Sequence, residues 1–224
     1  MNVKLLRNTP DPERTIAAAG RLCYAPVGAD ALFEEMSDAE ITKLLTFLIK
    51  VGHLSAIEHA SFTFAIEGVS RACTHQLVRH RLASYNQQSQ RYVTYENLDF
   101  ITPPTIAGNK DAAKAFTLGN KAALTVYKEL LAKGVPAEDA RYILPNAAET
   151  KIVVTMNARE LLHFFTLRCC NRAQWEIREL AVSMLDIVKE LAPTVFAAAG
   201  PSCVRNTCPE GSLTCGKPWP KHEY

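Results

Sequence analysis

Apolar residues recur along the chain at two spacings, and each spacing predicts a different kind of element. Residues 62–66 and 152–156 alternate apolar with polar or small side chains, which predicts two strands with one buried face each. Residues 41–48 instead place apolar side chains at i, i+3, i+4 and i+7, the stripe of an amphipathic helix. Further helices are expected over residues 12–24, 111–133, 136–143, 158–168 and 173–191.

Capping residues mark where several of these elements begin and end. Ser37 and Glu40 have the spacing of a capping box ahead of the 41–48 stripe, and Gly52 is placed to end that helix in a left-handed conformation. Gly68 is expected to end the 62–67 strand, and Ser70 to cap a helix that runs to about Arg79.

A strand over residues 3–6 is expected at a sheet edge, and an extended loop over 84–89. The apolar positions of the 111–133 helix are expected at Phe116, Ala123, Val126 and Leu130. Strands and helices do not alternate regularly as βαβ units, which indicates an α+β fold.

Composition limits the class of protein. The chain has 224 residues, 48% hydrophobic and 21% charged, with a formal net charge of +2, which suits one globular domain and not a general nucleic-acid binder. We expect that domain over residues 1–199 and an irregular tail over 200–224, where glycine and proline accumulate. No window suits a membrane span or an export signal, so seven reduced thiols in the cytoplasm are expected.

Basic residues gather in one stretch, residues 79–92, which contains Arg79, Arg81 and Arg91. No Asp or Glu occurs between Glu67 and Glu96. Guanidiniums accompanied by amides and hydroxyls suit a phosphate-bearing ligand, because the planar guanidinium meets phosphate oxygens in pairs. A solvated basic face or an inter-subunit salt-bridge patch remains the alternative. The charges of Arg141, Arg168 and Arg172 also fall near predicted element ends, where several could converge.

Thiols and histidines offer weaker candidates for chemistry. Cys23 and Cys73 fall in apolar stretches and are expected in the core, whereas Cys169 and Cys170 follow a helix C-terminus, where the dipole disfavours a thiolate. Covalent cysteine catalysis is therefore not expected.

Two metal sites are conceivable, but neither is predicted. Zinc could bind Cys203, Cys208 and Cys215 if Cys170 or His222 completed the set, yet the spacing favours ordinary thiols. The residues His53, Glu58 and His59 are not spaced as two imidazoles on one helical face, so ligand-contacting or core-capping histidines are favoured there.

The basic stretch resembles the signature of the flavin-dependent thymidylate synthases: Arg79-His80-Arg81, seven residues, then Ser89. The similarity extends from about residue 18 to residue 191. It includes Gly52-His53, Glu58-His59, Ala140-Arg141, Leu144-Pro145, Asn157-Ala158-Arg159, Leu167-Arg168 and Gln174-Trp175-Glu176. Several motifs in the right order make chance an unsatisfactory explanation.

The resemblance implies a fold and a reaction. Members of that family have a mostly antiparallel sheet flanked by helices and form homotetramers whose active sites combine several subunits. They bind FAD, reduce it with NADPH, and convert dUMP to dTMP with methylenetetrahydrofolate as carbon donor. They bind no nucleic acid or membrane and use no cysteine nucleophile.

The resemblance also implies roles for individual residues. It assigns Arg168 to activation of the uracil ring and Ser89 to positioning the substrate. The implied dUMP contacts are Gln76, Arg79, Gln87, Gln88, Ser89, Gln90, Arg91, Arg141 and Arg168. The implied FAD contacts are His53, Ser55, Arg79, His80, Arg81, Asn86, Gln87, Asn157, Arg159 and His163. Gln87 stands where some members carry Glu, and His163 stands where others carry Asn.

A different class of protein also fits part of the pattern. Tyr85, Tyr92 and Tyr95 interleave with Arg81 and Arg91, as aromatic and basic residues do in single-strand stacking surfaces. A non-catalytic nucleotide- or RNA-binding module is therefore the alternative, and the low net charge argues against it.

Overall fold

The computed structural model describes residues 1–222, within which four strands form one sheet. Their order is β1 (Asn2–Asn8), β2 (Ser61–Ser70), β4 (Glu149–Asn157) and β3 (Ala83–Gln87). β2 and β4 run antiparallel: the Ala158 N–H donates to the Ala60 carbonyl at 2.8 Å, and the Arg71 N–H donates to the Ala148 carbonyl at 3.0 Å. Helices and an antiparallel sheet confirm the α+β prediction.

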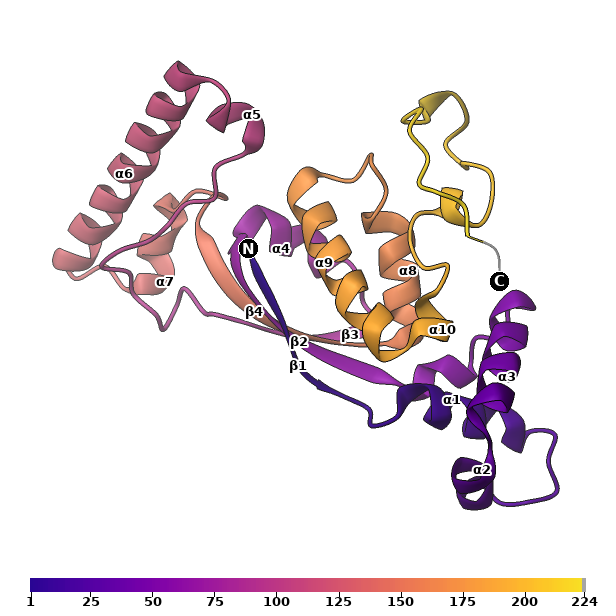
Figure 1. Ribbon diagram of the computed structural model, residues 1–224. Coiled ribbons are helices and arrows are strands. Elements are labelled where there is room, and N and C mark those ends of the chain that lie inside the picture. The colour runs from indigo at the N-terminus through magenta and orange to yellow at the C-terminus, as the bar shows by residue number, and fades with distance from the viewer. Residues whose placement is uncertain (223–224) are drawn as a thin grey trace. The chain divides into compact units, whose positions relative to one another are not determined.

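Figure 1 labels the strands and helices along the chain. The chain divides into two units, and the division passes through the strands. The first unit comprises residues 1–2, 66–79 and 85–153, and the second unit comprises residues 3–65, 80–84 and those from 154 onward. Helices of the first unit are α4 (Arg71–Leu77), α5 (Pro104–Ala107), α6 (Lys110–Ala132), α7 (Ala137–Ala140) and the 3-10 turn η2 (Arg141–Ile143).

The second unit contains the remaining helices. These are α1 (Pro12–Leu22), α2 (Ala29–Glu35), α3 (Asp38–Lys50), α8 (Ala158–Arg168), α9 (Trp175–Leu191), α10 (Pro193–Phe196) and the 3-10 turns η1 (Ala56–His59), η3 (Ser202–Val204) and η4 (Gly211–Leu213). Over the described chain, none of the helices combines the length and the apolarity that a bilayer crossing requires.

The alternating patterns bury the side chains that they predict. Phe62, Phe64 and Ile66 are fully buried. The side chains of Ile152, Val154 and Met156 are each at most 2% exposed. The short N-terminal strand is also confirmed, and the strand order places it at an edge of the sheet.

Gly68 lies inside β2, which corrects the expectation that it ends the strand. Its φ of 69° is left-handed, a conformation that glycine adopts without a Cβ clash. A glycine of this kind distorts a strand locally without stopping its pairing. Beyond it, Arg71 still donates its N–H to the carbonyl of Ala148, the residue just before β4.

Residues 84–87 form part of β3, so the loop expected over 84–89 was wrong for most of its length. The strand is held by its neighbour β4, and the Gln88 N–H just beyond it donates to the Lys151 carbonyl at 2.9 Å. Pairing with a distant segment decided the conformation here, because the local composition is that of a loop.

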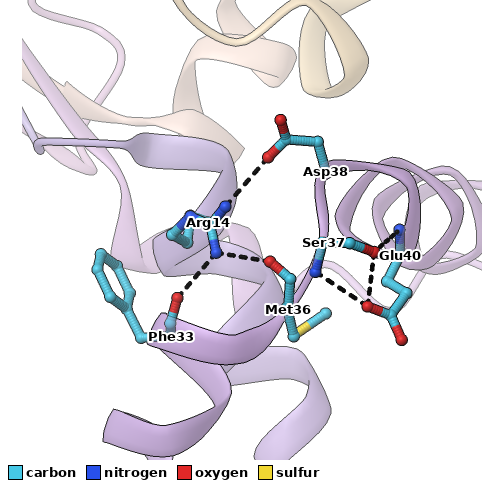
Figure 2. A network of polar contacts seen from close by, with 6 residues as sticks. All are labelled: Arg14, Phe33, Met36, Ser37, Asp38 and Glu40. Carbon is cyan, nitrogen blue, oxygen red and sulfur yellow. Dashed lines mark hydrogen bonds and ion pairs between the residues drawn. The ribbon is translucent and has the colours of Figure 1, made fainter.

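The α2–α3 connection is held by a capping box and by the hydrogen bonds of Arg14 (Figure 2). Ser37 and Glu40 form the predicted capping box, in which the Ser37 N–H donates to Glu40 Oε2 at 2.9 Å. Arg14 of α1 donates to the carbonyls of Phe33 and Met36 at 2.9 and 2.7 Å, and to Asp38 Oδ1 at 3.0 Å. The predicted left-handed Gly52 follows α3, with a φ of 77°.

An aromatic core connects β2, α8 and α10 in the second unit. Phe62 meets Phe196 edge-on at 5.8 Å, and Phe196 meets Phe165 at 6.0 Å. Phe164 and Phe165 are adjacent, with ring centroids 5.8 Å apart. Such edge-to-face contacts favour one arrangement of rings over others, so the core holds α8 in a defined rotation.

The buried face of α6 differs from the expectation. Val126 is 41% exposed, whereas the neighbouring Tyr127 is fully buried and packs against Tyr95 with ring centroids 6.3 Å apart. The larger aromatic side chain buries more surface than the valine, and only Val126 departs from the expected face, because Phe116, Ala123 and Leu130 are partly buried. The cluster around this pair consists of Leu98, Leu124, Leu130, Leu131, Val135, Ala140 and Leu144.

Replacing Gly68 should cost stability. In Gly68→Ala a Cβ would lie 3.3 Å from the Met1 Cα, and the left-handed φ would strain any side chain. We expect a loss of about 1–2 kcal/mol in the free energy of unfolding, measured by urea denaturation.

The matched control is Gly119→Ala within α6, where a Cβ meets nothing within 4 Å. This variant should gain up to about 1 kcal/mol through helix propensity. Equal effects of the two substitutions would contradict the assigned role of Gly68.

Candidate active site

Two arginines of the basic set meet at one residue of the first unit, Glu138. Arg91 Nε donates to Glu138 Oε2 at 2.8 Å, and Arg141 Nε donates to the Glu138 carbonyl at 3.0 Å. The Arg91 guanidinium also lies 5.5 Å from the centre of the Tyr92 ring. The expectation that these cations lack an acidic partner is therefore wrong for Arg91, which pairs with a carboxylate from a distant part of the sequence.

Polar side chains around β3 are held by short hydrogen bonds. Gln87 Nε2 donates to Thr74 Oγ1 at 2.9 Å and to Thr150 Oγ1 at 3.2 Å. Ser89 Oγ accepts the Arg91 N–H at 3.1 Å. The amide of a glutamine can donate hydrogen bonds to the two threonine hydroxyls, whereas an ionised glutamate at this position could only accept them.

Arg71 belongs with this group, although the sequence analysis did not select it. Its Nη1 donates to the Gln88 carbonyl at 3.4 Å. Burial and the nearby charge of Arg141 lower the pKa of Arg71. Two guanidiniums close together repel each other, so an anion bound near Arg71 and Arg141 would stabilise both. Its position at the start of α4, directly after the Ser70 cap, was the available sequence signal.

The remaining first-unit candidates differ in exposure. Gln90 is buried, Gln76 and Gln88 are half-buried, and Arg79 and Asn86 are exposed. α4 ends at Leu77, two residues before the end expected at about Arg79, so Arg79 follows the helix.

The second unit contains a hydrogen-bonded chain of three side chains: Arg168, His80 and Glu160. Arg168 Nε donates to His80 Nε2 at 3.1 Å, and His80 Nδ1 lies 3.3 Å from Glu160 Oε1. His80 and Glu160 are only 4% and 5% exposed. We call this the Arg–His–Glu chain.

The contacts of the chain determine the protonation of its histidine. A guanidinium can only donate, so His80 Nε2 accepts and the ring proton must lie on Nδ1, facing the Glu160 carboxylate. Burial, Arg168 and His163 together lower the pKa of His80 to about 4. The imidazole is therefore neutral at physiological pH, and it couples Arg168 to Glu160 without adding a charge.

Helix α8 supplies most of this arrangement. Glu160, Phe164 and Arg168 stand at i, i+4 and i+8, which places them on one face. His80 packs edge-on against Phe164, with ring centroids 4.9 Å apart, and its ring lies 5.8 Å from that of His163. Burial raises the pKa of Glu160. Glu160 was not among the sequence candidates, but its spacing to Arg168 was a signal that could have found it.

A cavity of about 500 Å³ in the second unit brings together three candidates, His53, Ser55 and Arg159. Arg159 Nη1 forms an ion pair with Glu58. The lining combines two imidazoles, the Ser55 hydroxyl and a guanidinium with apolar side chains of α1 and α3. Sites for aromatic, phosphorylated ligands have this composition.

The last two cofactor candidates lie outside these contacts. Asn157 Oδ1 accepts the Glu160 N–H at 2.9 Å and caps α8. Arg81 is exposed on the segment before β3.

The cysteines agree only partly with expectation. Cys73 is buried, but Cys23 is exposed, because it follows the end of α1 instead of continuing its apolar face. Cys169 is fully buried, and burial raises the pKa of its thiol to about 12. Within residues 1–222, no three His, Cys, Asp or Glu side chains converge as a ready metal cage.

Each unit therefore contains arginines with the donor geometry that phosphate oxygens accept, Arg91 and Arg141 in the first and Arg159 and Arg168 in the second. The family model described as thymidylate synthase complementing protein (Thy1) matches residues 4–194. The chain therefore belongs to that family.

Named relatives agree with this family, and a solved structure has a similar fold. Proteins named flavin-dependent thymidylate synthase are 57% identical in Geobacter sulfurreducens and 49% identical in Clostridium tetani, each over 97% of this chain and 94% of theirs. The fold is similar to that of a UMP/dUMP methylase from Streptomyces cacaoi, with a TM-score of 0.77 and 24% identity. That similarity covers 88% of this chain and 93% of the other.

The Arg–His–Glu chain predicts how His80 titrates. NMR of the labelled imidazole should give a midpoint near pH 4, with the proton on Nδ1, because protonation would place a buried cation against Arg168. Unfolded histidine titrates near 6.5, so the unfolded state binds more protons between about pH 4 and 6.5. The free energy of unfolding should therefore fall by about 3 kcal/mol as the pH falls through this window.

The His80→Gln variant isolates this effect. Glu160, whose pKa is raised, contributes in the opposite sense just above its ordinary value. Only the difference between the parent and His80→Gln curves is therefore assigned to His80. A midpoint above pH 6 would contradict the assignment.

Proposed function

We propose that the protein is a flavin-dependent thymidylate synthase that methylates dUMP to dTMP. Methylenetetrahydrofolate donates the carbon, NADPH-reduced FAD donates the hydride, and tetrahydrofolate is released. Family membership over residues 4–194 carries this proposal. The fixed guanidinium of Arg168 supplies the chemistry that such a reaction requires on its substrate.

The arginines of the first unit are proposed to bind the dUMP phosphate. Arg91 and Arg141 meet at Glu138, and Ser89 lies next to Arg91. Each charge-assisted contact to a phosphate contributes about 1.5–3 kcal/mol, so two or three suffice for micromolar binding. The proposed substrate contacts are Gln76, Arg79, Gln87, Gln88, Ser89, Gln90, Arg91, Arg141 and Arg168.

Arg168 is proposed to act on the uracil ring. A guanidinium beside N3 stabilises the ionised ring, because a fixed cation lowers the energy of a developing anion. Ionisation enriches C5 in electron density, and C5 can then attack the methylene carbon. His80 and Glu160 fix the direction of the guanidinium through Nε, so little reorganisation is needed when charge develops.

The cavity lined by His53, Ser55 and Arg159 fits part of a flavin dinucleotide. Its guanidinium and hydroxyl suit a diphosphate, and its apolar side chains suit a ring system. When bound, FAD would accept a hydride from NADPH and return it to complete the methyl group. The other proposed contacts are Arg79, His80, Arg81, Asn86, Gln87, Asn157 and His163.

No cysteine is proposed as a nucleophile. Cys169 is buried with a raised pKa, which leaves its thiol protonated. The Ser89 hydroxyl accepts the Arg91 N–H, which suits substrate positioning.

We also propose a cytoplasmic homotetramer with active sites shared between subunits and catalysis assigned to residues 1–199. Large apolar side chains support association: Leu82, Tyr92 and Tyr142 are 73, 80 and 85% exposed. Apolar surface of this kind favours burial against a partner. Seven free cysteines suit a reducing compartment. A nucleic-acid-binding module is not favoured, because family membership points to the enzyme.

The purified protein should be yellow, and NADPH should bleach its flavin absorbance. Added methylenetetrahydrofolate should then cause release of tritium from dUMP labelled at C5. Colourless protein that cannot be reconstituted with FAD would overturn the proposal, and steep salt-dependent binding of single-stranded RNA by such protein would favour the alternative module.

Arg168→Lys should retain the fold and the flavin but lower the turnover number roughly ten- to a hundredfold, because an ammonium cannot reproduce the directed donors of a guanidinium. The measurement is tritium release at saturating dUMP. Arg7→Lys on exposed β1 is the control and should match the parent. Unchanged turnover in Arg168→Lys would refute the assigned role.

A further inference from the structure

Four cysteines that the proposed reaction does not use line one cavity of the second unit. The cavity has a volume of about 390 Å³. Cys170, two residues beyond the end of α8, lines it together with Cys203, Cys208 and Cys215 of the tail. All four are half-buried free thiols. The fold therefore brings together two parts of the sequence that share the same soft ligand chemistry.

Nitrogen donors point at two of these sulfurs. The Lys217 N–H and Asn171 Nδ2 donate to Cys215 Sγ at 3.4 and 3.8 Å, and the Trp219 N–H donates to Cys203 Sγ at 3.4 Å. Donors of this kind stabilise a thiolate, which is the metal-binding form of cysteine.

Charge around the cavity favours the same ligand. A divalent cation with four thiolates carries a net charge of −2, which needs compensation in a half-buried setting. Arg168, Arg172 and Lys217 line the same cavity, and Arg172 lies 4.0 Å from its single carboxylate, Glu210. The lining therefore has a net positive charge that offsets part of the charge of a metal tetrathiolate.

We propose that Cys170, Cys203, Cys208 and Cys215 bind one Zn²⁺ and fasten the tail to the end of α8. Each thiol loses its proton to solvent as its Zn–S bond forms, with no change of oxidation state. Reduced cysteine sulfur is a preferred ligand of structural zinc, which is tetrahedral with four protein ligands. His222 does not line the cavity, and its backbone N–H donates to the Val204 carbonyl.

The described residues face this cavity without converging on one point, so binding requires the thiols to turn inward. Rotation about one bond redirects each sulfur. The tail can also adjust, because its only regular elements among the described residues are the short turns η3 and η4. Segments with so little core are commonly stabilised by a metal, and binding is then coupled to folding.

Metal analysis of the full-length protein, purified without chelators, tests the proposal. Inductively coupled plasma mass spectrometry should find about one zinc per chain. X-ray absorption should give four sulfur ligands at about 2.3 Å. Cys208→Ser and Cys215→Ser should each lower the zinc content at least fivefold, and limited proteolysis should then cleave the tail faster.

Cys23→Ser is the matched control, because this exposed cysteine does not line the cavity. It should retain the zinc content of the parent. Less than a tenth of a zinc per chain in the parent, even after incubation with Zn²⁺ under reducing conditions, would overturn the proposal. Disulfides among these four residues in protein purified under reducing conditions would also overturn it, as would undiminished zinc in the double variant Cys208→Ser/Cys215→Ser.

The zinc proposal does not depend on the proposed enzyme activity. Zinc in a colourless, inactive protein would retain the metal site and reject the flavoenzyme. An active flavoprotein without zinc would do the reverse.

Discussion

A single buried hydrogen-bonded chain constrains the second unit more than any other contact. Glu160 and Arg168 both belong to α8, and His80 spans the distance between them along the helix face. Burying a carboxylate is costly unless a donor satisfies it. The neutral imidazole meets that requirement through Nδ1 and accepts the Arg168 proton donor through Nε2. The ring is held in turn by Phe164, whose neighbours Phe165 and Phe196 belong to the aromatic core. The direction of the guanidinium is therefore set by core packing as well as by polar contacts.

Local patterns predicted most of the fold. The capping box at Ser37, the left-handed Gly52 and the alternation of β2 and β4 all depend on neighbouring residues, and each was confirmed. The exceptions depend on distant partners. β3 looks like a loop until β4 pairs with it, and Gly68 looks like a strand end until the pairing beyond it is known. Periodicity also cannot decide between adjacent positions of a helix when one is valine and the next is tyrosine, as at Val126 and Tyr127.

Sequence analysis located the candidate arginines but not their counterions. Arg91 and Glu138 are 47 residues apart, and Arg159 and Glu58 are 101 apart. A stretch without acidic residues is therefore no guide to the charge around it in the folded protein. Glu160 was not among the candidates either, although its spacing to Arg168 places both on one helix face. For the tail cysteines, the spacing in the sequence favoured ordinary thiols. Only the folded chain shows that they share a cavity with Cys170.

The carboxylate of Glu138 changes what the first unit can select. An anion that binds Arg91 meets the carboxylate of Glu138, which already pairs with Nε of that guanidinium. A singly charged ion such as chloride merely replaces one negative charge with another and gains little. A phosphate monoester brings nearly two negative charges and more acceptor oxygens. Because Glu138 already pairs with Arg91, a doubly charged phosphate ester gains more from binding there than a singly charged ion does. Simple salts therefore compete poorly with such esters.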